Sequence, residues 1–106
     1  MNTRIYYFYR DGANYKLPMY EIVSGTIDIQ GFYDDRSFNA DYFYPAKIGF
    51  CADTFVDRGY KAYDDDPDFH EIYSLEETNM EPTVQMTAEE FWEACRNGAC
   101  ERRIPV

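Results

Sequence analysis

The sequence IYYFYRDGANYKLPMYEIV, residues 5–23, decides the fold of this chain. Its first six residues are mostly β-branched or aromatic, which favours a strand that is covered on both faces. The turn residues DGAN follow at positions 11–14, and glycine and asparagine tolerate the positive φ angles of tight turns. Residues 15–23 predict a second strand, and Pro18 places it at a sheet edge or a bulge because proline donates no ladder hydrogen bond. The stretch therefore predicts an N-terminal β-hairpin.

The clearest helix signal lies near the other end of the chain. The sequence TAEE at residues 87–90 is a capping box, in which the threonine and glutamate side chains each accept a hydrogen bond from the other residue's backbone amide. Apolar Phe91 and Trp92 follow, and Gly98 is suited to end a helix. We expect a helix from about Ala88 to Asn97, docked on the sheet by Phe91 and Trp92.

The segment between hairpin and helix gives weaker signals. Residues 24–38 fit a continuing strand or a short helix equally well, and residues 41–50 fit a short strand or a packed loop. Residues 69–75 predict a strand in which Tyr73 and Leu75 share one side.

Length and composition place all these elements in one domain. The chain has 106 residues, of which 45% are hydrophobic, enough to bury a core without disulfides or metal. No repeat or linker divides it. We expect a single α+β domain over residues 1–106, with a small, mostly antiparallel sheet begun by the hairpin and the C-terminal helix packed on one face.

Acidic residues are concentrated in one block. The chain has 20 acidic and 10 basic residues, for a net charge of −10. Residues 62–93 contain eleven of the acids and no lysine or arginine, whereas the other seventy-four residues are nearly balanced. The block comprises Asp64, Asp65, Asp66, Asp68, Glu71, Glu76, Glu77, Glu81, Glu89, Glu90 and Glu93. A one-sided negative field disfavours direct binding to nucleic acid or to an anionic membrane and favours a basic partner.

Two stretches resemble a known group of proteins. Residues 9–16, YRDGANYK, and residues 69–78, FHEIYSLEET, are similar to two motifs of a group of small, uncharacterised bacterial and mobile-element proteins. Those motifs are Tyr-Arg-Asp-x-x-Asn-Tyr-Lys and Trp-His-Glu-Phe-x-Ser-x-Glu-x-Thr, and this chain has Phe69 for the tryptophan and Ile72 for the phenylalanine. The resemblance covers under a fifth of the chain. It implies a single α+β domain and no particular activity.

Charge and resemblance together predict a non-catalytic interaction module that binds a basic protein surface. Its most concrete form is a phage or mobile-element inhibitor, or a nucleic-acid mimic, that acts on a basic host protein, for example an anti-CRISPR or anti-restriction protein. A housekeeping domain with a merely solvated acidic face is the alternative. The predicted contact residues are the acids Asp64, Asp65, Asp66, Asp68, Glu71, Glu76 and Glu77, with Tyr60, Tyr63 and Tyr73 as aromatic contacts.

His70 supports a second alternative, a small enzyme or ligand-binding domain, because histidine titrates near neutrality. The chain holds a single histidine, so no zinc-binding HExxH helix is present. A strand histidine bonded to a neighbour is the simpler interpretation. The aspartate run at 64–68 lacks the glycine and glutamate of an EF-hand loop, and we expect neither metal nor cofactor.

The aromatic hairpin and the cysteines have simple interpretations. The tyrosines of the hairpin suit a stacking platform for bases, but basic residues are sparse there, and sheet packing explains the tyrosines better.

Cysteines occur at three positions, Cys51, Cys95 and Cys100, so at least one thiol is unpaired. The N-terminus shows no secretory signal, and no apolar run approaches the length of a membrane span. We expect free thiols in a reducing cytoplasm.

Overall fold

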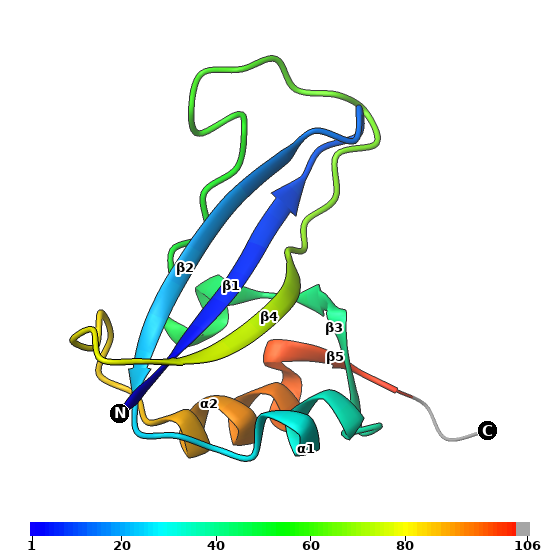
Figure 1. Ribbon diagram of the computed structural model, residues 1–106. Helices are drawn as coiled ribbons and strands as arrows, with labels where there is room; N and C mark the ends of the chain where they lie inside the picture. The colour runs from blue at the N-terminus through cyan, green and yellow to red at the C-terminus, as the bar shows by residue number, and fades with distance from the viewer. Residues whose placement is uncertain (104–106) are drawn as a thin grey trace.

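The computed structural model describes residues 1–103 and confirms the α+β fold (Figure 1). A three-stranded antiparallel sheet has the order β2-β1-β4, and a two-stranded sheet pairs β3 with β5. The elements are β1 (Asn2–Arg10), β2 (Lys16–Ser24), α1 (Ile29–Asp34), β3 (Phe38–Phe43), the 3-10 helix η1 (Pro45–Ile48), β4 (Glu71–Thr78), α2 (Ala88–Ala94), the π-type turn η2 (Cys95–Ala99) and β5 (Cys100–Arg102).

The predicted hairpin is confirmed. Strands β1 and β2 pair over their full length, from Arg10 opposite Lys16 to Asn2 opposite Ser24. Strand β1 lies in the middle of the sheet, and β2 lies at its edge, as Pro18 predicts. The hairpin turn and the long loop before β4 lie at one end of the molecule, and α1 and α2 lie at the other (Figure 1).

Alternation along β1 separates a core face from an open face. Ile5, Tyr7 and Tyr9 are buried on the core face, and Tyr7 is fully enclosed. Tyr6 and Phe8 lie on the opposite face, where they are only half-buried. The prediction that both faces of this strand are covered is therefore wrong. On the open face the rings shield one another instead, since Tyr73 lies 5.7 Å from each of the two rings.

Strand β4 runs from Glu71 to Thr78, so it overlaps the predicted strand at residues 69–75 but begins and ends later, and its side chains alternate differently. The register against β1 shifts between Tyr6 and Tyr7, which inserts Tyr73 as an extra residue. As a result Ile72 and Leu75 both face the core, whereas Tyr73 faces solvent. The prediction that Tyr73 and Leu75 share one side is wrong because of this bulge.

The ambiguous middle segments become short elements. Residues 24–38 contain α1, whose N-terminus is capped by Asp28: its carboxylate accepts a hydrogen bond from the Gly31 amide at 3.1 Å. Residues 41–50 contain the end of β3 followed by η1. For residues 41–50, the short strand is therefore confirmed up to Phe43, and the packed segment that follows contains a 3-10 helix.

Helix α2 begins at the predicted capping box. The Glu90 amide donates to Thr87 Oγ1 and the Thr87 amide donates to Glu90 Oε1, both at 3.0 Å. The regular helix ends at Ala94, three residues before the predicted end, and η2 closes it with Gly98 at φ +111°. The Phe91 ring is fully buried between Phe50 and Phe32, each 5.7 Å away.

Trp92 docks α2 in a different way from the prediction. Its indole nitrogen donates to Asp35, just after α1, at 2.7 Å, so it ties the two helices together. Asp35 also accepts hydrogen bonds from Arg96 and from Ser37. Although desolvation raises the pKa of Asp35, these hydrogen bonds outweigh it and hold the pKa well below its ordinary range.

The cysteines are all free, as predicted. Cys95 and Cys100 are buried in the core and Cys51 is exposed. Burial, together with the neighbouring Cys100, raises the pKa of the Cys95 thiol well above its usual value. Within residues 1–103, no helix combines the length and apolar character that a bilayer crossing requires.

Truncation of Phe91 tests the packing of the core. We expect Phe91→Ala to lower the free energy of unfolding by about 3–5 kcal/mol, because it leaves a cavity between two stacked rings. Urea denaturation measures this change. The control Glu89→Ala, on the exposed side of the same helix, changes stability by less than about 0.5 kcal/mol. Equal losses at the two positions would contradict this account of the core.

Candidate binding site at the hairpin turn

The hairpin turn is held by one carboxylate. Asp11 Oδ1 accepts hydrogen bonds from the amides of Ala13 at 3.0 Å and Tyr15 at 2.8 Å. This bonding pattern is typical of aspartate in turns, and Asn14 adopts the left-handed conformation, with φ +68°, that asparagine tolerates. The sequence DGAN thus produces a turn whose backbone is fixed by its own first side chain.

The acidic loop packs directly onto this turn. Asp66 accepts hydrogen bonds from the Gly12 amide at 2.7 Å and from the Tyr63 amide at 3.0 Å, one with each carboxylate oxygen. The Tyr9 hydroxyl donates to the Pro67 carbonyl at 2.8 Å. A Cβ atom at Gly12 would overlap the Asp65 side chain, so glycine permits this close approach.

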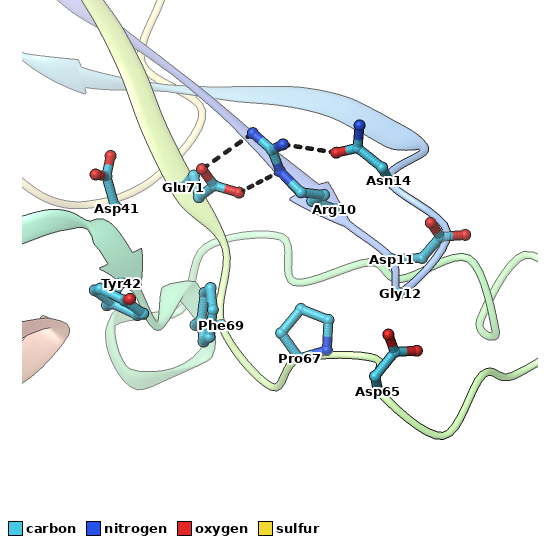
Figure 2. Close-up of a pocket in the computed structure, with 10 residues that line it drawn as sticks. All are labelled: Arg10, Asp11, Gly12, Asn14, Asp41, Tyr42, Asp65, Pro67, Phe69 and Glu71. Atoms are coloured by element: carbon cyan, nitrogen blue, oxygen red, sulfur yellow. Dashed lines mark hydrogen bonds and ion pairs between the residues drawn. The ribbon is translucent and has the colours of Figure 1, made fainter.

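Arg10 joins the turn to strand β4. Its guanidinium donates to both carboxylate oxygens of Glu71, at 2.9 and 3.4 Å, and to Asn14 Oδ1 at 2.7 Å (Figure 2). The pair is partly shielded, because the Glu71 side chain is only 18% exposed. Arg10 and Asn14 belong to the first stretch that resembles the bacterial group, and Glu71 belongs to the second. The two stretches therefore meet in one hydrogen-bonded network.

An open hollow of about 460 Å³ lies beside this network. Asp41 and Asp65 stand at its opposite ends, with Phe69 and Pro67 between them (Figure 2). The Tyr42 ring packs edge-on against Phe69 at 4.6 Å. Four carboxylates line the hollow against one guanidinium: Asp11, Asp41, Asp65 and Glu71 against Arg10. The hollow is therefore negative and has an aromatic wall.

The structure distributes the predicted acidic contact residues among different roles. Asp64, Asp65, Asp68 and Glu77 are exposed. Asp66 holds the loop on the turn, as described above.

The two glutamates on β4 that face arginines form ion pairs. Glu71 is paired with Arg10. Glu76 is paired with Arg4 at 2.5 Å and also accepts a hydrogen bond from the Tyr6 hydroxyl at 2.9 Å. The hydrogen bonds from Tyr6 and Arg4 lower the pKa of Glu76.

The acidic block as a whole is divided between the two ends of the molecule. The segment 62–93 begins in the loop beside the hairpin turn, continues along β4 and ends in α2 at the far end (Figure 1). Of the predicted aromatic contacts, Tyr60 and Tyr63 lie in or near the acidic loop, and Tyr73 lies on the open sheet face.

Sequence reasoning missed the part of the site that comes from β3. Asp41 and Tyr42 lie at least 25 residues from either motif in the sequence, and only the position of β3 beside β4 brings them to the hollow. The sequence predicts Asp11 as a turn residue and gives it no role in a site. Its local signal, an aspartate that opens a turn, is structural.

His70 has the surroundings of a structural residue. It is 3% exposed, its Nε2 lies 3.0 Å from the Asp53 carbonyl oxygen, and its Nδ1 is enclosed with no hydrogen-bond partner among residues 1–103. Burial lowers its pKa, because desolvation disfavours the charged ring. His70 and Asp68 line a hollow of about 210 Å³, but one ring nitrogen is bonded and the other is shielded. Acid–base catalysis needs a nitrogen within reach of the substrate, so this geometry gives the enzymatic alternative no support.

Within residues 1–103, no group of three or more histidine, cysteine or carboxylate side chains is arranged to hold a metal ion. Comparison of the chain with protein-family models, curated proteins and solved structures finds no match.

Removal of the Asp66 carboxylate tests how the acidic loop is held. We expect Asp66→Ala to raise the hydrogen-exchange rates of the Gly12 and Tyr63 amides at least about tenfold, because a charged hydrogen bond contributes roughly 1.5–3 kcal/mol. Exchange measured by NMR resolves both amides. Asp64→Ala removes a neighbouring carboxylate of equal charge and leaves both rates unchanged. Equal effects of the two variants would show that charge, and not the bonds of Asp66, holds the loop.

The pH dependence of stability tests the environment of His70. Its pKa in the folded protein lies below the ordinary value of 6.5, so the unfolded chain binds the proton more tightly. The contribution of His70 to the free energy of unfolding is therefore fully present above pH 6.5. It is lost as the pH drops toward the folded-state pKa, by at most about 1.4 kcal/mol per pH unit. Urea denaturation between pH 5.5 and 7.5, where the carboxylates are largely ionised, measures this slope, and His70→Gln removes most of it because the chain has no other histidine. Parallel curves for the two proteins would refute the assignment.

Proposed function

We propose that this protein is a non-catalytic interaction module that binds a basic protein surface through the hollow at the hairpin turn. The observation that carries the proposal is the excess of carboxylates around a hollow with an aromatic wall. The contact surface is the hollow together with the exposed loop carboxylates of Asp64, Asp65 and Asp68.

The distribution of ion pairs supports a cationic ligand. The charge of Arg10 is balanced by Glu71, so the negative charge that remains at the hollow comes chiefly from Asp41 and Asp65. Both of these side chains are exposed. An arginine side chain of the partner would pair with either carboxylate and place its guanidinium against the rings of Tyr42 and Phe69.

The rigidity of the turn favours binding as well. The bonds made by Asp11, Asp66 and Arg10 fix the backbone on one side of the hollow before any partner arrives. Binding to a preformed surface loses less conformational entropy than binding to a mobile loop. The site is therefore suited to selective recognition and not only to solubility.

The nucleic-acid-mimic version of the prediction is not part of this proposal. Mimicry of duplex DNA needs carboxylates in a row at a density near one charge per ~1.7 Å. Here Glu71 and Glu76 are paired with arginines, and Glu89, Glu90 and Glu93 lie on α2 at the opposite end. A compact acidic site fits a basic side chain or short segment better than it imitates a long phosphate backbone.

Neutralisation of the hollow tests the proposal. With fluorescein-labelled octa-arginine as the probe, we expect the double variant Asp41→Asn/Asp65→Asn to raise the Kd roughly tenfold, because each exposed pair contributes about 0.5–1 kcal/mol. Fluorescence anisotropy at low ionic strength measures the Kd, and added salt weakens wild-type binding steeply.

The matched control is Glu81→Gln/Glu89→Gln, which changes the net charge equally at exposed positions away from the hollow. We expect it to raise the Kd less than twofold. Equal weakening by the two double variants would mean that overall charge alone attracts the probe, and the proposed site would have to be abandoned.

A further inference from the structure

A second hollow also borders the hairpin turn at Asp11 and has a different character. It encloses about 450 Å³ and is lined by four aromatic side chains. They are Tyr15, Phe55, Tyr60 and Tyr63. Tyr15 and Tyr60 are each 66% exposed, and Tyr60 packs edge-on against Phe55 at 5.7 Å. Exposed aromatic side chains gathered around a concavity are typical of binding surfaces.

The charges at this second hollow differ in sign from those at the first. Two lysines, Lys16 and Lys61, line it together with Asp11. Neither lysine forms an ion pair within the part of the chain that the structure describes. Each ammonium group instead lies near an aromatic ring, 5.6 Å from Phe8 for Lys16 and 5.9 Å from Tyr63 for Lys61.

These features favour an uncharged aromatic group as the occupant. The tyrosine rings of the hollow attract another aromatic ring edge-on or offset. The ammonium groups of the two lysines are attracted to the face of such a ring. A cationic group is repelled by the two lysines. An anion would meet the negative field of Asp64 and Asp65 in the same loop, and of a chain whose net charge is −10.

Asp11 connects the two hollows physically. It lines both of them, and its carboxylate is fixed by the amides of Ala13 and Tyr15. Tyr15 is itself a wall of the second hollow. The two hollows therefore share a wall at Asp11, and the hairpin turn holds that wall in place.

We propose that the second hollow receives an aromatic side chain of the same partner whose basic side chain enters the first. This inference rests on the proposed function and makes it more specific: the recognised segment carries an arginine and an aromatic residue a few positions apart. The negative hollow selects the first residue and the aromatic hollow selects the second.

Two matched series of synthetic peptides test the inference. The first is acetyl-Arg-(Gly)n-Phe-amide with n from 1 to 4, which spans roughly 7–17 Å between the two side-chain-bearing residues when extended. The second series has alanine in place of phenylalanine. NMR titration of the labelled full-length protein measures the Kd of each peptide. We expect the phenylalanine peptide to bind roughly five- to tenfold more tightly than its alanine counterpart at one spacing or more.

Two tyrosine variants locate the effect. We expect Tyr60→Ser to abolish the advantage of the phenylalanine peptides and to leave binding of the alanine peptides unchanged. Tyr73→Ser removes a similarly exposed tyrosine from the open sheet face and preserves the advantage.

The outcomes separate this inference from the proposed function. If the alanine peptides shift the amides of Asp41 and Asp65 but phenylalanine adds nothing at any spacing, the second hollow is not an anchor site and the proposed function stands. An advantage that survives in Tyr60→Ser also overturns the assignment of the second hollow. If neither series perturbs the first hollow, the proposed function fails, and this inference fails with it.

Discussion

The alternation of side chains along β1 is the constraint on which the rest of the structure depends. This strand is paired on both sides, so its backbone cannot shift without breaking two ladders. Ile5, Tyr7 and Tyr9 are thereby committed to the core, and Arg4, Tyr6 and Phe8 to the open face. The same register places Arg10 at the end of the strand, two residues beyond Phe8, and its side chain reaches Glu71 opposite Phe8, where the candidate site begins.

Carboxylates in this protein divide into those that hold the fold and those that face solvent. Asp11, Asp35 and Asp66 accept hydrogen bonds from backbone amides, and Glu71 and Glu76 pair with arginines across the sheet. A charge with fixed partners is partly compensated and contributes less to the external field. The net charge of the chain therefore overstates the negative surface that a partner meets, and the position of the free carboxylates matters more than their number.

Local features of the fold could be predicted from the sequence, whereas features that depend on distant segments could not. The hairpin turn and the capping box of α2 use bonds between residues at most four positions apart, so their sequence patterns are sufficient. The bulge at Tyr73 depends on the register against β1, which no local pattern encodes. Likewise, no feature of the sequence distinguishes the three consecutive aspartates Asp64, Asp65 and Asp66. Only Asp66 becomes structural, because the Gly12 amide, fifty-four positions earlier, faces it in the fold.

The contrast between the two hollows suggests how a strongly acidic chain can still be selective. A net charge of −10 acts over a distance of roughly one Debye length, about 8–10 Å, and attracts any basic surface, so it raises the rate of encounter without distinguishing partners. Discrimination requires short-range features that only some partners match. Next to one turn this protein places a hollow with four carboxylates and a hollow with two lysines and four aromatic rings. Under the proposed function, a uniformly basic surface would pair with the carboxylates of the first hollow and would be repelled by the lysines of the second. On this proposal, the second hollow opposes the unselective attraction that the net charge produces.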